Sequence, residues 1–338
     1  MQTYSGKSAA GLICLLALTT GCSAGSDGTA DAAPPESSAA PSESSATSTS
    51  YAPYVSATTA SEYDSAGSPT TYNLAFVISD GNDCTPRWNG TDAVSDSAVK
   101  SRISRLTQDG STVRVSFGGA SGKELAASCD SASALAEAYG KALDAAGSSQ
   151  ADFDIEGDEL TDSDSVDLRS QAIALLQKER SDLEVSFTLP VMPSGLDDDS
   201  MALLESANEH DVQVSTVNIM TMNYGESYDG DMGDYALASA RATHTQLKDV
   251  FGTSDATAWK AMALTSMLGT NDVDNETFTL DDAAQVREFA EEKGIGWVSV
   301  WATFRDRQCD DDTASDDALT ECSGVEQEDG AFAEAFSG

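Results

Sequence analysis

Short apolar runs alternate with segments of helical spacing from Tyr72 to about residue 303. Runs rich in β-branched and apolar residues predict strands at 74–78, 113–117, 152–156, 185–189, 214–222, 261–265 and 296–303. Apolar residues at helical spacing predict helices at 134–145, 168–179, 235–250 and 281–293. This alternation of strands and helices indicates a parallel sheet that is covered by helices.

The number of strands favours a closed barrel. Seven strands within about 240 residues, most of them followed by a helix, are typical of an α/β protein with a (β/α)8 TIM barrel. No G-x-G-x-x-G motif opens a helix, which disfavours a dinucleotide-binding fold. We expect the eighth strand near Trp88 or between Val94 and Leu106.

Residues 1–22 have the pattern of an export signal. Lys7 precedes an apolar run, 11–18, that is too short to span a bilayer, and small residues follow it. The ending Gly21-Cys22 resembles the lipobox of bacterial lipoproteins, in which the cysteine carries lipid, although Thr19 stands where Leu is usual. Cleavage after 30–32 is the alternative. Both predict a cell-surface or extracellular protein, whose membrane contact is at most an N-terminal lipid anchor.

A low-complexity segment follows the predicted signal. Residues 23–70 are rich in Ser, Thr, Ala and Pro, and such a segment buries too little apolar surface to offset its ordering entropy. We therefore expect a disordered linker over 23–70. The remaining residues, 71–338, are predicted to form the folded barrel, as a monomer.

The charge of the chain restricts its partners. Lys and Arg number 18 against 57 Asp and Glu, which gives a formal net charge of −39. A negative field of this size repels nucleic acid and anionic membrane surfaces. It is compatible with a neutral or cationic polymer, but acidic residues also keep an exported protein soluble, so the charge does not identify the substrate.

The segment Asp152-Phe153-Asp154-Ile155-Glu156 carries the candidate chemistry. Alternate side chains of a strand share a face, so the three acids point one way and the two apolar residues the other. In a barrel the acids would point into the lumen near the carboxyl-terminal rim, where barrel active sites lie. Neighbouring carboxylates raise one another's pKa, and such groups serve as general acids. A solvated acidic edge strand is the alternative, but Phe153 and Ile155 indicate one buried face.

In this segment the chain resembles the family 18 glycoside hydrolases, the chitinase family. The family motif D-x-x-D-x-D-x-E matches at its last three acids, whereas Ser149 replaces the first. Three further segments are similar in the same order along the chain: the strand 115–119 ending in Gly-Gly, the segment 220–225, and Trp301 in the last strand. The resemblance spans residues 72 to about 310.

The resemblance implies a mechanism assisted by the substrate, in which the sugar's own acetamide group is the nucleophile. Glu156 would act as general acid and base, Asp154 would orient the acetamide, Asp152 would tune Asp154, and Tyr224 would donate its hydroxyl to the acetamide carbonyl. Trp301 would stack under the sugar ring. Further substrate contacts are expected from Met222, Asn223, Gly118 and Gly119.

Chitin or N-acetylglucosamine oligosaccharides are therefore the expected partners, without a cofactor or a metal. Acid groups such as 197–199 and 272–274 lack EF-hand spacing and are expected to be solvated loops. Two alternatives use the same fold: cleavage of N-glycan cores or peptidoglycan, and sugar binding without catalysis. The presence of Glu156 favours catalysis.

Four cysteines remain after the signal and Cys22, and three disulfide pairings of them are possible. An exported protein meets an oxidising environment, so disulfides are expected. The pairing Cys84–Cys129 with Cys309–Cys322 is favoured because each bond then joins neighbouring segments of the barrel.

Overall fold

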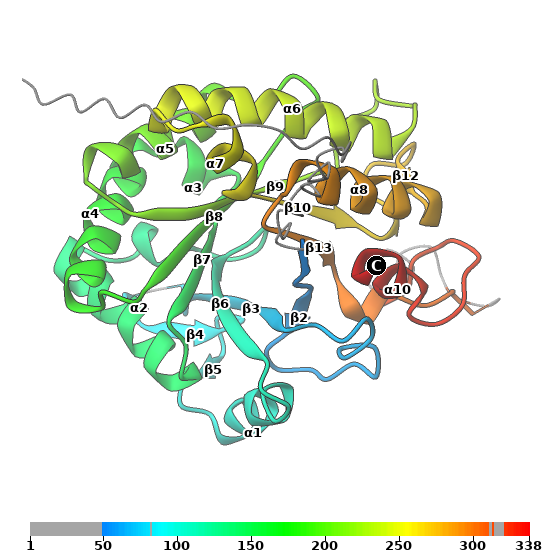
Figure 1. The fold of residues 1–338 in the computed structure, drawn as a ribbon. Coiled ribbons are helices and arrows are strands. Elements are labelled where there is room, and N and C mark those ends of the chain that lie inside the picture. The colour runs from blue at the N-terminus through cyan, green and yellow to red at the C-terminus, as the bar shows by residue number, and fades with distance from the viewer. Residues whose placement is uncertain (1–48, 82, 311–312, 314–320) are drawn as a thin grey trace, which may run out of the picture. The chain divides into compact units, whose positions relative to one another are not determined.

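A computed structural model describes residues 49–81, 83–310, 313 and 321–338. Its centre is a closed ring of parallel strands with helices around it, which confirms the predicted (β/α)8 barrel (Figure 1). The ring positions after the first are β3 (Thr71–Ser79), β6 (Thr112–Gly118), β7 (Gln150–Asp154), β8 (Glu184–Pro190), β9 (Val214–Met220), β10 (Met262–Met267) and β13 (Trp297–Trp301). All seven predicted strands are present at these positions.

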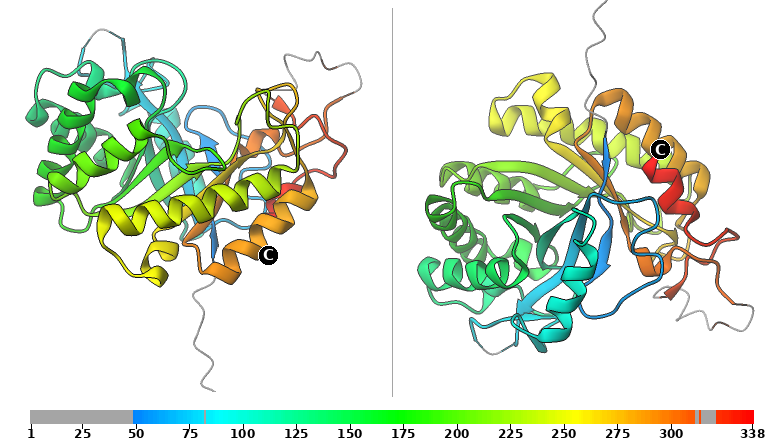
Figure 2. Two further views of the ribbon diagram at one scale, coloured as in Figure 1. Left: turned by 90° about the horizontal axis from the view of Figure 1, so that it is seen from above. Right: turned by 60° about the horizontal axis from the view of Figure 1, so that its bottom comes forward.

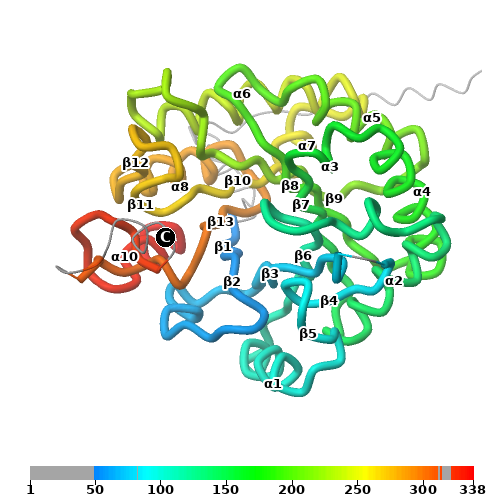
Figure 3. Tube along the Cα trace, turned by 180° about the vertical axis from the view of Figure 1, so that it is seen from behind, coloured from blue at the N-terminus to red at the C-terminus, as the bar shows by residue number. Residues whose placement is uncertain are grey.

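The first ring position is split into two short strands. β1 (Ser50–Tyr51) pairs in parallel with β13, and β2 (Tyr54–Ser56) pairs in parallel with β3. Between them, Ala52 N donates to Val298 O at 2.9 Å, and Pro53 O accepts from Asn73 N at 2.9 Å. This segment therefore closes the barrel, and Figure 3 shows β1 beside β13 although they come from opposite ends of the described chain.

The closing strand corrects two predictions. Residues 49–70 were predicted as part of the linker 23–70, but they belong to the barrel domain. The eighth strand was expected near Trp88 or between Val94 and Leu106. Instead, β4 (Pro86–Trp88) runs antiparallel to β3 and β5 (Asp92–Ala93) pairs with β4, outside the parallel ring, while 97–106 forms helix α1. The predicted signal 1–22, the predicted lipid attachment at Cys22 and the part of the predicted linker up to residue 48 lie outside the described residues.

Helices surround the ring, and Figure 2 shows this arrangement from two further directions. They are α1 (Ser97–Leu106), α2 (Ala132–Ala146), α3 (Asp158–Thr161), α4 (Ser163–Glu179), α5 (Asp198–Glu209), α6 (Met232–Phe251), α7 (Asp255–Lys260), α8 (Leu280–Lys293) and α10 (Ala331–Ser337). Short 3-10 turns are η1 (Leu125–Ala127) and η2 (Thr303–Arg305). The four predicted helices are confirmed as parts of α2, α4, α6 and α8. No described helix is long and apolar enough to cross a membrane.

The acidic segment 197–199 begins a helix rather than forming a solvated loop. Asp197 caps α5, since its side chain accepts a hydrogen bond from Ser200 N at 2.8 Å. Asp198 and Asp199 lie in the first turn of α5, where the positive end of the helix dipole stabilises negative charge. The cluster is therefore explained by helix capping.

Apolar packing lies between the ring and the helices. Phe117, Phe153 and Phe187 come from three adjacent strands, and their rings pack in a row with centroids 5.3 and 5.7 Å apart. Tyr139 of α2 packs edge-on against the first two. Phe153 and Ile155 have no exposed surface, which confirms the predicted apolar face of β7. The intervening acids consequently face the lumen.

Two disulfides join segments that follow barrel strands. Cys84, after β3, is bonded to Cys129, after η1, and Cys309 is bonded to Cys322. Both pairings are the predicted ones. The first links the two loops that follow β3 and β6.

Candidate active site

Asp152 lies inside the barrel with no exposed surface. It accepts four hydrogen bonds from hydroxyl groups: Ser116 at 2.7 Å, Ser186 at 2.7 Å, Thr188 at 2.8 Å and Tyr54 at 2.9 Å. Three of these donors come from β6 and β8, the two strands that flank β7, and the fourth comes from β2, which pairs with β3 elsewhere in the ring. Because each oxygen of the carboxylate accepts two of these hydrogen bonds, Asp152 is fully hydrogen-bonded without access to water.

A buried cation lies deeper in the barrel. Arg114, two residues before Ser116 on β6, donates to Asn73 Oδ1 at 2.6 Å, and its guanidinium lies 4.7 Å from the ring centre of Trp297. Burial lowers the pKa of Arg114, and the charge of Asp152 counteracts this effect. Arg114 therefore partly balances the charge of Asp152 inside the lumen.

Asp154 lies one step nearer the rim on the same face of β7. It is buried, and its Oδ1 has no hydrogen-bond partner among the described residues. Burial raises the pKa of Asp154 well above the usual value, and the negative charges of Glu156 and Asp152 raise it further. A buried oxygen without a partner, beside a cavity, is available to bind a donor on a ligand.

Glu156 follows the end of β7 and points into the cavity. The pKa of Glu156 is raised to about 7. Burial raises it most, a hydrogen bond with Asp154 lowers it, and the charges of Asp272 and Glu159 raise it further. A carboxyl group with this pKa holds a proton close to neutral pH and can also release it. This is the requirement for a group that acts first as an acid and then as a base.

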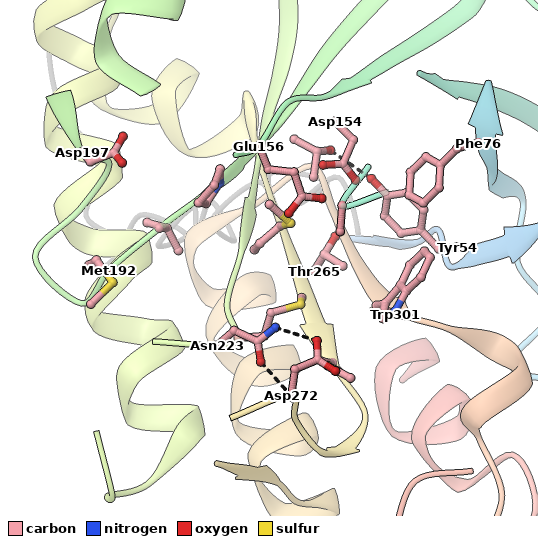
Figure 4. Close-up of a pocket in the computed structure, with 17 residues that line it drawn as sticks. Tyr54, Phe76, Asp154, Glu156, Met192, Asp197, Asn223, Thr265, Asp272 and Trp301 are labelled. Atoms are coloured by element: carbon pink, nitrogen blue, oxygen red, sulfur yellow. Dashed lines mark hydrogen bonds between the residues drawn. The ribbon is translucent and has the colours of Figure 1, made fainter. Parts of the chain in front are cut away.

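The acids open into a cavity of about 360 Å³ at the carboxyl ends of the strands (Figure 4). Its lining consists of Tyr54, Phe76, Ala120, Asp154, Glu156, Thr188, Pro190, Val191, Met192, Asp197, Met220, Met222, Asn223, Thr265, Met267, Asp272 and Trp301. The rings of Phe76 and Trp301 are stacked with centroids 5.5 Å apart. In Figure 4 these rings lie on one side of Glu156, and Met192 and Asp197 lie on the other. An apolar wall with a few converging polar groups is typical of a small-molecule site.

Most of the predicted site residues lie at this cavity. Glu156, Asp154, Trp301, Met222 and Asn223 line it, and Asp152 supports Asp154 from below.

Gly118 and Gly119 do not line the cavity. A Cβ on Gly118 would lie 2.1 Å from Asp154 O, and one on Gly119 would lie 2.8 Å from the ring of Phe76. Both also have positive φ angles, 100° and 89°. The structure therefore shows a requirement for close packing at these glycines, and Ala120 is the neighbour that faces the cavity.

The predicted placement of Tyr224 is wrong. Its hydroxyl is 3.4 Å from Ser239 Oγ of α6, its ring packs against Tyr228 and Tyr235, and it is absent from the cavity lining. The reason is local: β9 ends at Met220, and Asn223 adopts a left-handed conformation with φ of 55°. This turn ends the strand alternation and directs the tyrosine into the helix layer.

Three residues at the site were not foreseen. Tyr54 was placed in the linker, and Phe76 was only part of a predicted strand. Asp272 was grouped with solvated acids, but it lines the cavity. A signal for Tyr54 existed in the aromatic and β-branched residues Tyr51, Tyr54 and Val55, but the surrounding Ser- and Thr-rich composition obscured it.

Comparisons with known proteins agree with this geometry. No family model matches the chain. The chain is 35% identical over 275 residues to the probable bifunctional chitinase/lysozyme of Escherichia coli (strain K12), covering 76% of this chain and 31% of that protein. It is 33% identical over 248 residues to endochitinase 11 of Metarhizium anisopliae, covering 70% of this chain and 47% of that protein. The chain thus spans about a third to a half of these curated relatives.

Solved structures give a fuller match. The catalytic domain of the hyperthermophilic chitinase from Pyrococcus furiosus is 30% identical, with a TM-score of 0.74, over 85% of this chain and 93% of that one. Catalytic-site mutants of the same domain have been solved with chito-oligosaccharides, at 29% identity and a TM-score of 0.73. With its barrel, its acidic strand and these relatives, the chain belongs to glycoside hydrolase family 18, the chitinase family.

Proposed function

We propose that this protein hydrolyses β-1,4-linked N-acetylglucosamine chains, with Glu156 as the general acid and base. One observation carries the proposal: a carboxyl group with a pKa of about 7 faces the cavity beside the unpartnered oxygen of Asp154. The names of the relatives and the chito-oligosaccharides bound to the Pyrococcus domain support this substrate class.

The arrangement supports the substrate-assisted route of the family. Glu156 donates its proton to the glycosidic oxygen, and the bond from that oxygen to the anomeric carbon breaks. The carbonyl oxygen of the 2-acetamido group forms a bond to the same carbon, which gives a cyclic oxazolinium ion. Asp154 Oδ1 accepts the acetamide N–H and stabilises the positive charge that develops there.

Water then completes the reaction. Glu156, now ionised, takes a proton from a water molecule whose oxygen bonds to the anomeric carbon. The acetamide carbonyl leaves, so the configuration is retained and Glu156 is protonated again for the next cycle. A pKa near 7 suits both steps because neither the acid nor the base form is strongly disfavoured.

The aromatic wall supplies the sugar contacts. Trp301, stacked with Phe76, presents an apolar surface to the cavity. The C–H face of a pyranose ring packs on such a surface, while its hydroxyl groups turn outward. Tyr54 links this wall to the acids because its hydroxyl binds Asp152 while its ring packs edge-on against Trp301.

A second candidate is the cleavage of peptidoglycan. The Escherichia coli relative is named chitinase/lysozyme, and peptidoglycan contains acetamido sugars that can react by the same chemistry. Both candidates require Glu156, so substrate comparison distinguishes them.

We also propose export to the cell surface with lipid on Cys22. The basic start, the short apolar run and Gly21-Cys22 support this, and the two disulfides are typical of an oxidising compartment. Cell fractionation of the wild type and of C22A, expressed in a bacterium, tests the anchor. Loss of membrane association in C22A is expected; release of both forms would contradict the anchor.

Product analysis tests the catalytic proposal. Wild type and E156Q are incubated with chitohexaose, chitosan, peptidoglycan and an N-glycoprotein. We expect shorter oligosaccharides of β configuration from chitohexaose, and a loss of at least about 100-fold in E156Q, since general acid catalysis contributes this much. E156Q should still bind chitohexaose. Cleavage of peptidoglycan alone would favour the second candidate, and binding without cleavage by the wild type would contradict both.

A further inference from the structure

Asp272 enters the cavity from a segment that is far from β7 in the sequence. It lies between β11 (Gly269–Thr270) and β12 (Thr277–Phe278) and lines the cavity beside Asn223, below Glu156 and Thr265 in the view of Figure 4. The preceding residue, Asn271, is buried, and its Nδ2 donates to Met267 O at 3.1 Å and to Gly269 O at 3.0 Å. These bonds hold the backbone at Asp272 in place.

Asp272 and Asn223 bind each other reciprocally. Asn223 Nδ2 donates to Asp272 Oδ2 at 3.0 Å, and Asp272 N donates to Asn223 Oδ1 at 3.0 Å. Asn223 has a φ of 55°, in the left-handed region that asparagine adopts more readily than most residues other than glycine, and its reciprocal bonds with Asp272 give this conformation further support. Gly225 N, two residues on, donates to Glu276 Oε1 at 2.8 Å.

Asn223 reaches the cavity in the segment where the resemblance gave the substrate contact to Tyr224. Asn223 lines the cavity, whereas the tyrosine points into the helix layer. An amide nitrogen carries two N–H donors, and the bond to Asp272 uses one of them. The second donor remains for an oxygen of the sugar.

Asp272 also acts electrostatically on Glu156, because its negative charge raises the pKa of the Glu156 carboxyl group. Three acidic groups act on Glu156: a hydrogen bond with Asp154 lowers its pKa, whereas the charges of Asp272 and of Glu159 on α3 raise it. Among the described residues that line the cavity, none is a Lys, an Arg or a His. Arg305 is a cation that interacts with this segment: its guanidinium donates to Leu268 O and Thr270 O, and the charge of Asp272 counteracts the lowering of the Arg305 pKa by burial. A negative charge at Asp272 therefore opposes the ionisation of Glu156 from across the cavity.

We propose that Asp272 is a positioning residue for the hydrolysis: it holds the amide of Asn223 toward the sugar and keeps a negative charge opposite the acid group of Glu156. This inference rests on the proposed function. It assigns to a pair on two separate loops the substrate contact that was expected from the tyrosine after β9.

Two substitutions separate the two roles of Asp272. D272N removes the charge but keeps an oxygen for Asn223 Nδ2, whereas D272E keeps the charge. D274N is the matched control, because it removes an exposed carboxylate from the same loop that does not line the cavity. Asp272 is exposed, so these variants are expected to fold. The rate of cleavage of a fluorogenic chitobioside is measured from pH 4 to 9 with each full-length protein.

In D272N we expect the alkaline limb of the kcat profile to move to lower pH by about half a unit, a modest shift because solvent screens an exposed charge. The shift should shrink in 1 M NaCl, and D272E and D274N should keep the wild-type limb. D272A, which also loses the oxygen for Asn223, should show a KM raised by about fivefold, consistent with a lost hydrogen bond.

Two results would overturn this inference and leave the proposed function standing: alkaline limbs that coincide for wild type and D272N, or an equal shift of the limb in D274N. An absence of cleavage by the wild type at every pH would overturn the proposed function, and this inference with it.

Discussion

The hydroxyl of Tyr54 donates a hydrogen bond of 2.9 Å to Asp152 Oδ2, across 98 residues of the chain. Tyr54 belongs to β2, in the segment that closes the barrel, and Asp152 lies on β7, deeper in the barrel than Asp154 and Glu156. The same hydroxyl lies 3.0 Å from Thr188 Oγ1, which itself donates to Asp152. Closure of the ring and support of the acids thus depend on the same residue.

Replacement of Tyr54 by Phe should reduce kcat by about tenfold, because a buried carboxylate then loses one of its donors. The ring remains, so the packing against Trp301 and the fold should persist. Turnover of a chito-oligosaccharide, together with the thermal midpoint, checks this expectation. Y72F is the control: Tyr72 is buried next to Asn73 but on the other face of β3. An equal loss in both variants would contradict a specific role of the Tyr54 hydroxyl.

The pKa of Glu156 predicts the alkaline limb of activity. The residue must carry a proton to cleave the glycosidic bond, and burial raises its pKa to about 7. We therefore expect kcat to fall as the pH rises through about 7. Initial rates between pH 4 and 9, with thermal unfolding at each pH to exclude denaturation, test this. A constant kcat up to pH 9 in a folded protein would show that another group is the acid.

The same residue predicts a dependence of stability on pH. The carboxyl of Glu156 has a pKa of about 7 in the folded protein and near 4.5 when unperturbed, so the folded state binds its proton more tightly. The proton held by Glu156 therefore contributes fully to the free energy of unfolding at low pH. This contribution is lost as the pH rises from about 4.5 to 7.

E156Q removes this charge, so it should raise the free energy of unfolding at pH 8 by about 1–3 kcal/mol and change it little at pH 4. Urea unfolding of wild type and variant at both pH values measures the difference. A variant that is less stable than the wild type at pH 8 would contradict the burial of an unfavourable charge.

Y224F should keep activity within about threefold of the wild type, because the tyrosine hydroxyl only approaches Ser239 at 3.4 Å and does not reach the cavity. The kcat and KM on chitohexaose test this. A loss as large as that of E156Q would mean that Tyr224 turns into the cavity when substrate binds.

The two disulfides should differ in their effect on stability. Cys84 and Cys129 are separated by 45 residues, whereas Cys309 and Cys322 are separated by 13. Because a longer closed loop restricts the unfolded chain more, C84A/C129A should cost about 3–4 kcal/mol and C309A/C322A about 1 kcal/mol less. Chemical unfolding of the two double variants gives the order. The reverse order would indicate that native packing dominates over chain entropy.

The barrel and its acidic strand could be predicted from the sequence. Alternation of Asp152, Phe153, Asp154, Ile155 and Glu156 is a local property, because each side chain's direction follows from the backbone of its own strand. The pairing of the cysteines followed once neighbouring segments of the barrel were assigned.

Only the tertiary structure decided which distant residues complete the site. Tyr54, Arg114 and Asp272 reach the acids or the cavity through ring closure and loop packing. No periodic pattern of apolar and polar residues predicts these contacts. Tyr224 shows the converse, since a turn at Asn223 ended the alternation and directed its side chain away. Contacts between segments depend on how the whole ring closes, whereas a strand's two faces depend only on its own backbone.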